Sequence, residues 1–164
     1  MGTEIERKFL VKSDAWRAGA ATQSVLRQGY LASDGGNTVR VRLDDRRAWL
    51  TVKGPSEGCR RAEFEYEVPL EEAEELLELC GNRVVEKMRS RVPVGLHVWE
   101  VDEFAGRNAG LTVAEIELSS ESEAVHMPDW VGREVTGDRR FDNASLSRCP
   151  LADWSAADRA MAVI

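Results

Sequence analysis

The chain has 164 residues, of which 43% are apolar and 31% charged, so we expect residues 1–164 to form a single domain with a substantial core. The formal net charge of −7 argues against a general nucleic-acid-binding protein, because such proteins use a basic patch to neutralise phosphates. No apolar run is long enough to cross a bilayer, and the acidic N-terminal residues are unlike a signal peptide, so we expect a cytoplasmic protein without a membrane partner.

The N-terminal stretch, residues 1–11, predicts a strand with two chemically different faces. Successive side chains of a strand alternate between its faces, so Glu4, Glu6 and Lys8 point one way while Ile5 and Phe9 point the other. A water-exposed outer face would explain one such segment. The same alternation recurs further along the chain, however, and the recurrence carries the functional argument.

Seven further strands are predicted, each bounded by turn-forming residues, over residues 24–31, 38–43, 48–53, 61–68, 84–92, 97–104 and 111–118. Charged residues occupy alternate positions in several of them. Arg40 and Arg42 share one face of their segment, and Glu115 and Glu117 share one face of theirs. Some strands thus carry basic residues on this face, and others carry acidic residues.

Apolar residues at helical spacing predict one clear amphipathic helix over residues 70–80, which Gly81 ends. The acidic residues in its first turns are interpreted as a solvated face. Shorter helical segments are expected after Ser13, from Ser119, at residues 144–146 and in the tail from Trp154 to Ile164, with an extended piece at 132–137 and a loop at 138–143.

Cysteine and histidine offer few metal ligands in this sequence. The three cysteines, Cys59, Cys80 and Cys149, are widely spaced, which predicts reduced thiols without a disulfide or a zinc site. His97 and His126 are the two histidines, too few for a three-histidine centre. A bound metal must therefore be held by carboxylate oxygens.

Together, the predicted strands place many charged side chains on one face. The acids there are Glu4, Glu6, Glu63, Glu65, Glu67, Glu100, Asp102, Glu115 and Glu117, and the bases are Lys8, Arg40, Arg42, Lys53, Lys87, Arg89 and Arg91. A wet sheet surface normally mixes in uncharged polar residues, which are scarce at these positions. Phosphate suits the bases, and Mg²⁺ or Mn²⁺ suits the carboxylates. A barrel enclosing a metal–phosphate chain satisfies both sets.

An ordered series of motifs spans nearly the whole chain. The motifs are Glu4-x-Glu6-x-Lys8, Gln28-Gly29-Tyr30-Leu31, Thr38-Val39-Arg40-Val41-Arg42, Thr51-Val52-Lys53-Gly54, Glu63-Phe64-Glu65-Tyr66, Lys87-x-Arg89, Glu100-x-Asp102, Glu115-x-Glu117, Glu134-Val135-Thr136 and Asn143-Ala144. This series closely resembles the CYTH superfamily of triphosphate tunnel metalloenzymes. The resemblance implies an α+β fold, an eight-stranded antiparallel β-barrel that forms a tunnel with helices packed outside. It also implies metal-dependent reactions of triphosphates.

The resemblance further implies roles for individual residues. Phosphate would be bound by Lys8, Arg40, Arg42, Lys53, Lys87 and Arg89. Mg²⁺ or Mn²⁺ would be held by Glu4, Glu6, Glu63, Glu65, Asp102, Glu115 and Glu117. Lys8 and Tyr30 are the candidate catalytic pair for proton transfer, although packing is the alternative role of Tyr30. Glu67, Arg91 and Glu100 lie near strand ends and are left unassigned.

The leading functional hypothesis is hydrolysis of inorganic triphosphate to pyrophosphate and phosphate, by metal-assisted attack of water on a terminal phosphoryl group. A class IV type adenylate cyclase, a thiamine triphosphatase and a non-catalytic polyphosphate-binding module are the alternatives. Because no base-binding insertion is recognisable, triphosphatase is favoured over cyclase. Thiamine would need to stack on Trp49 or Trp99, which we expect to point outward beneath helices. A homodimer is left open.

Overall fold

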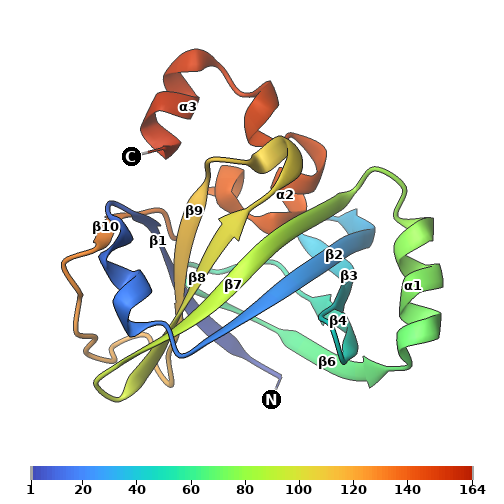
Figure 1. Ribbon diagram of the computed structural model, residues 1–164. Helices are drawn as coiled ribbons and strands as arrows, with labels where there is room; N and C mark the ends of the chain where they lie inside the picture. The colour runs from blue at the N-terminus through green and yellow to red at the C-terminus, as the bar shows by residue number, and fades with distance from the viewer. Residues whose placement is uncertain (1, 164) are drawn as a thin grey trace.

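The computed structural model describes residues 2–163 and shows a strongly curved sheet around a central cavity, with helices outside it (Figure 1). Its ten strands are β1 (Glu4–Val11), β2 (Thr22–Asp34), β3 (Asn37–Leu43), β4 (Ala48–Lys53), β5 (Arg60–Arg61), β6 (Glu63–Val68), β7 (Val84–Val94), β8 (His97–Phe104), β9 (Thr112–Glu117) and β10 (Val131–Glu134). The predicted fold class is confirmed. The strands beyond the eight expected are the short β5 and β10.

The strands follow the order β10-β1-β9-β8-β7-β2-β3-β4-β6, and neighbouring strands are antiparallel. The two ends of this path do not pair as one continuous ladder, unlike the closed barrel that was predicted. The short β5, which directly precedes β6 in the chain, pairs with the start of β1 and places Arg61 opposite Glu4. This two-residue strand therefore connects the β6 side of the sheet to β1.

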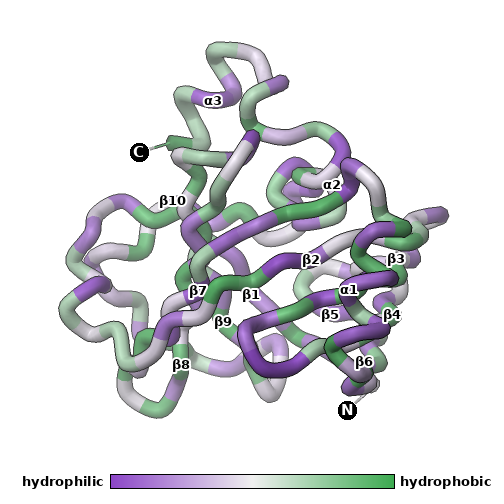
Figure 2. The backbone as a smooth tube through the Cα atoms, turned by 45° about the vertical axis from the view of Figure 1, so that its right-hand side comes forward, coloured by the Kyte–Doolittle hydropathy of each residue, from purple (hydrophilic) through white to green (hydrophobic). Residues whose placement is uncertain are grey.

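Hydrophilic and hydrophobic residues are interspersed along the strands (Figure 2). The apolar faces of the strands point away from the cavity, and three clusters of buried residues form the core. In the first cluster, Phe9 and Trp130 each pack edge-on against Trp99, with ring centroids 5.5 Å apart. The second cluster lies between the sheet and the C-terminal segment and includes Leu146. The third lies beneath α1 and includes Val41 of β3. Burial of these faces holds the charged faces inward.

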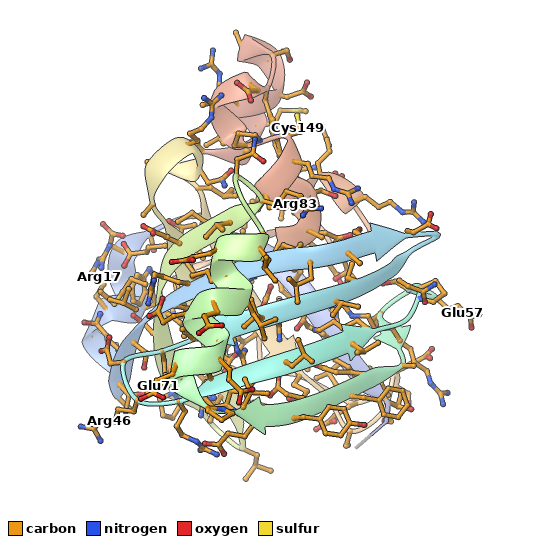
Figure 3. The ribbon with its side chains drawn as sticks, turned by 90° about the vertical axis from the view of Figure 1, so that its right-hand side faces the viewer. Arg17, Arg46, Glu57, Glu71, Arg83 and Cys149 are labelled. Carbon is orange, nitrogen blue, oxygen red and sulfur yellow. The ribbon has the colours of Figure 1, made fainter. Side chains whose placement is uncertain are left out.

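The helices are α1 (Leu70–Leu79), α2 (Asn143–Arg148) and α3 (Ala156–Ala162), with short 3₁₀ helices at Asp14–Gly19, Gly106–Asn108, Arg139–Phe141 and Leu151–Asp153. Figure 3 shows α1 lying across the outer face of β2, β3 and β4. The amphipathic helix at residues 70–80 is thus confirmed. Within residues 2–163, no helix has the length and apolar character needed to cross a membrane.

The prediction of a helix from Ser119 is wrong, because the described chain has no helix between β9 and β10. The carboxylate of Glu123 accepts hydrogen bonds from the backbone N–H of Ser119 at 2.5 Å and from its hydroxyl at 2.6 Å. It also lies 2.7 Å from Nε2 of His97. These contacts fold the segment into turns. Met1 and Ile164, included in the N-terminal stretch and the expected C-terminal helix, lie outside the described residues.

Candidate active site

A cavity of about 1210 Å³ occupies the interior of the curved sheet. All the predicted phosphate-binding residues line it, together with Tyr30 and every predicted metal ligand except Asp102. Arg91 and Glu100, which were left unassigned, line it as well. Glu67 does not, and instead pairs with Arg47 at the exposed surface. Alternating strand positions therefore predicted most of the charged side chains that line the cavity.

One wall is built by β3, β4 and β6, where Arg40, Thr51 and Glu65 lie side by side in register. The hydroxyl of Thr51, which is fully buried, donates to Glu65 at 2.8 Å and accepts from Nη2 of Arg40 at 3.1 Å. Nη2 of Arg42 lies 3.3 Å from the same glutamate. The Nε atoms of both arginines are buried without a partner among the described residues. These donors are available to an anion in the cavity.

A second group joins β1, β4 and β5. Nζ of Lys53 donates to the two carboxylate oxygens of Glu4 at 2.9 and 3.1 Å, and Nε of Arg61 donates to Glu4 at 2.6 Å. Burial raises the pKa of Glu4, but Lys53 and Arg61 outweigh it and lower the pKa to about 2. Arg61 was missed by the sequence reasoning, although it shares the strand parity of Glu63, which would have revealed it.

A third group lies on β7, β8 and β9, centred on the fully buried Asp102. Nζ of Lys87 donates to Asp102 at 2.5 Å, and Nε and Nη2 of Arg89 donate to it at 2.7 Å each. Burial lowers the pKa of Lys87 to about 8, even though Asp102 raises it. Asp102 does not line the cavity, so its predicted role as a metal ligand does not fit this arrangement. We propose that Asp102 instead orients Lys87 and Arg89, which both donate hydrogen bonds to its carboxylate.

Carboxylates crowd around Lys8 where β1 meets β9. Nζ of Lys8 lies 3.1 Å from Glu115 and 3.9 Å from Glu6, and Glu6 stands opposite Glu117 in the register. Burial and the charge of Glu115 raise the pKa of Glu6 to about 7. Although burial raises the pKa of Glu115, Lys8, Lys87 and Arg89 lower it well below its usual value. The two glutamates therefore differ sharply in proton affinity.

Tyr30 is buried at the cavity wall, where its hydroxyl accepts a hydrogen bond from Nε2 of Gln28 at 3.0 Å. Burial raises the pKa of Tyr30, which keeps the phenol protonated at neutral pH. Among the described residues, Lys8 bonds to Glu115 and to the carbonyl of Phe141, not to Tyr30. The structure thus brings the candidate pair into one cavity without a direct hydrogen bond between its members.

The C-terminal segment contributes to the cavity, although no local pattern assigned it a role. The side-chain oxygen of Asn143, the first residue of α2, accepts from Nζ of Lys87 at 3.1 Å. Nη2 of Arg148 donates to the carbonyl of Ser33 on β2 at 3.0 Å. Asn143 and Arg148 both line the cavity. The segment after the sheet therefore reaches back to complete its wall.

The two tryptophans expected to point outward differ in position. Trp99 is fully buried in the outer core, as expected. Trp49 lies on the inner face of β4, directly opposite Arg42, so the expectation for it was wrong. Trp49 and Lys53 are an even number of positions apart on β4, so their side chains point to the same face of the sheet. The alternation of side chains along β4 therefore places Trp49 on the inner face, whereas a position beneath a helix was expected.

Comparisons with known proteins agree with this geometry. The model of the CYTH domain family matches residues 2–147. The chain belongs to the CYTH domain family. An inorganic triphosphatase of Acetivibrio thermocellus is 49% identical over 155 residues, covering 94% of this chain and 99% of that protein. This CYTH domain is also 36% identical over 150 residues to an inorganic triphosphatase of Nitrosomonas europaea, covering 88% of this chain and 97% of that protein.

A crystal structure of an inorganic triphosphatase shares the fold of this CYTH domain. It superposes with a TM-score of 0.65 at 34% identity, covering 90% of this chain and 95% of that chain. The family resemblance expected from the sequence motifs is thereby confirmed.

The donor chemistry of this CYTH domain fits a hard divalent cation. Within residues 2–163, no three acidic, histidine or cysteine side chains already converge as a metal centre. Glu6 and Glu117 nevertheless face each other, and the raised pKa of Glu6 reflects burial and crowding by Glu115. A cation would relieve this crowding, and carboxylate oxygens are the ligands that Mg²⁺ and Mn²⁺ prefer. We propose that Glu6, Glu115 and Glu117 would hold the ion.

Glu6→Gln should stabilise this CYTH domain at alkaline pH. Because the pKa of Glu6 rises from 4.5 to about 7 on folding, the folded state binds more protons between these values. The contribution of Glu6 to stability therefore falls as pH rises through this window. We expect Glu6→Gln to raise the free energy of unfolding at pH 8 by about 1–3 kcal/mol, with little change near pH 4.5.

Urea unfolding at both pH values measures this effect. The exposed Glu75→Gln on α1 is the matched control and should leave the pH dependence unchanged. Destabilisation of Glu6→Gln at pH 8 would show that Glu6 serves the fold through its charge.

Proposed function

We propose that this protein hydrolyses inorganic triphosphate to pyrophosphate and phosphate. The observation that carries the proposal is the pair of buried guanidinium Nε groups of Arg40 and Arg42, which have no partner in the described part of the chain and lie in a cavity lined by further cations. Buried donors are rarely left without acceptors, and phosphate oxygens suit arginine geometry. The relative that is 49% identical to this chain is an inorganic triphosphatase, which supports the same reaction.

In the proposed reaction, water attacks a terminal phosphorus, the bridging P–O bond breaks, and pyrophosphate leaves. Arg40, Arg42 and Lys53 would bind phosphate oxygens from one wall, and Lys87 and Arg89 from another. Their charges would stabilise the negative charge on the leaving pyrophosphate. When bound, Mg²⁺ or Mn²⁺ would supply further charge neutralisation and lower the pKa of a coordinated water.

Lys8 and Tyr30 would act as hydrogen-bond donors in this reaction. Burial lowers the pKa of Lys8, but Glu115 and Glu6 outweigh it and raise the pKa above its usual value, so the ammonium group is retained. The phenol of Tyr30 also keeps its proton, because burial raises its pKa. Both groups can therefore stabilise phosphate oxygens, and neither is placed to act as a general base at neutral pH.

An adenylate cyclase would use the same clamp but needs a nucleoside whose 3′ hydroxyl lies in line with the α-phosphate. Trp49, an aromatic side chain on the inner face, lies beneath the guanidinium groups of Arg42 and Arg47. It is therefore already occupied as a stacking surface. This contact favours inorganic triphosphate over a nucleotide or thiamine triphosphate.

Separating the products by anion-exchange chromatography tests the proposal. We expect fast conversion of inorganic triphosphate to pyrophosphate and phosphate with Mg²⁺ or Mn²⁺, slower release of phosphate from ATP, and no cyclic AMP. Cyclic AMP with pyrophosphate from ATP would establish a cyclase instead. No product from any triphosphate, including thiamine triphosphate, would leave a polyphosphate-binding module.

The remaining features of the proposal concern the setting of the reaction. We propose Mg²⁺ or Mn²⁺ as the ion and the cytoplasm as the location, with no nucleic-acid or membrane partner. A homodimer stays a prediction that sedimentation analysis would test.

A further inference from the structure

A row of three side chains crosses the inner face of the sheet beside the β3–β4 turn, where Figure 3 labels Arg46. Arg42 on β3 stands directly opposite Trp49 on β4, and Trp49 stands directly opposite Glu67 on β6. Directly opposed side chains in an antiparallel pair are close enough to interact. Of the three, Arg42 alone lines the cavity.

Arg42 has few hydrogen bonds that fix the plane of its guanidinium group. Its Nη2 lies 3.3 and 3.4 Å from the oxygens of Glu65, which also bonds to Thr51 and Arg40. Its Nε has no partner among the described residues. A planar donor binds phosphate through two parallel hydrogen bonds only when its plane is correctly turned. Some other contact must therefore set this plane.

Trp49 provides that contact. Cζ of Arg42 lies 5.1 Å from the centre of the indole ring, within the range of a cation–π interaction. A contact through the flat face of the guanidinium group leaves the Nε edge, which is unpartnered within residues 2–163, available to an anion.

The indole ring is itself held in place from the exposed side. Cζ of Arg47 lies 5.2 Å from the ring centre. Arg47 donates to the two oxygens of Glu67 at 2.9 and 2.5 Å, and its backbone N–H donates to Asp44 at 2.7 Å. Arg47, which pairs with Glu67, thus packs against Trp49, and Trp49 also contacts Arg42.

We propose that Trp49 is a positioning residue that holds the guanidinium group of Arg42 in the plane in which its free N–H groups meet the phosphate chain. The inference rests on the proposed function, because it requires Arg42 to bind phosphate. Loss of the aromatic face leaves Arg42 present but free to turn, so substrate binding suffers more than the chemical step.

Steady-state kinetics with inorganic triphosphate and Mg²⁺ test this role in folded variants that differ in the aromatic face at position 49. Trp49→Leu keeps an apolar side chain without an aromatic face and should raise KM about fivefold, with kcat changed less than about twofold. Trp49→Phe keeps an aromatic face and should restore KM to within about twofold of the wild type. Val52→Ala, on the opposite face of β4, is the matched control and should leave KM unchanged.

A double-mutant cycle with Arg42→Ala shows whether Trp49 acts through Arg42. Adding Trp49→Leu to Arg42→Ala should change KM by less than about twofold, because the group it positions is gone. The same fivefold increase in both backgrounds, or a Trp49→Phe variant as weak as Trp49→Leu, would overturn the inference while the wild type still hydrolysed triphosphate. A wild type without triphosphatase activity would overturn the proposed function and this inference together.

Discussion

Arg40→Ala is expected to lower kcat/KM for inorganic triphosphate by about 10²–10³-fold, the usual cost of removing one donor that stabilises developing negative charge. Arg40 is buried, and its Nε has no acceptor within residues 2–163, so this N–H group is available to a ligand. The variant should remain folded, because the substitution removes an unsatisfied buried donor. Arg40→Lys should recover part of the activity, since it restores the charge without the planar donor geometry.

The matched control for this experiment is Arg7→Ala. Arg7 lies on β1 and makes a two-pronged pair with Glu134 at 2.9 and 2.7 Å, outside the cavity lining. Its removal should change kcat/KM less than about twofold, since exposed ion pairs contribute little. Equal losses in Arg40→Ala and Arg7→Ala would indicate that general electrostatics, not a clamp inside the cavity, governs activity.

Removing divalent cations with EDTA is expected to abolish hydrolysis, and Mg²⁺ or Mn²⁺ should restore it. Glu6 lies where burial and the charge of Glu115 disfavour a further negative charge, and Glu117 stands opposite Glu6 in the register. Ca²⁺ should not restore activity, because it is larger and looser in geometry. Thermal unfolding gives an independent readout. Mn²⁺ should raise the melting temperature of the wild type and have a smaller effect on Glu117→Gln.

Full activity in EDTA would show that hydrolysis does not require a divalent cation. An equal response of the wild type and Glu117→Gln to Mn²⁺ would place the ion elsewhere. Both outcomes are distinguishable from unfolding, because the melting temperature is recorded for each protein.

Strand alternation predicted the inner wall because the physical rule is local. Glu4, Glu6 and Lys8 share a face whatever the rest of the chain does, and all three line the cavity. The same rule would have placed Trp49 inward had its parity with Lys53 been followed. Most of the fold and the charged set were therefore readable from the sequence.

Features that depend on three-dimensional pairing were not predictable in this way. Asp102 has the parity of a cavity residue, yet Lys87 and Arg89 cover both of its oxygens. The turns from Ser119 result from the long-range position of His97, which lies against Glu123. The periodicity of neighbouring residues along the sequence does not reveal these two sets of contacts.

Hydrolysis of inorganic triphosphate in ¹⁸O-labelled water tests the central claim most directly, with mass spectrometry of the separated products. Attack of water on the terminal phosphorus predicts one ¹⁸O atom in the orthophosphate and none in the pyrophosphate. Label in the pyrophosphate would show attack on the central phosphorus, and the absence of labelled product would contradict hydrolysis in this cavity.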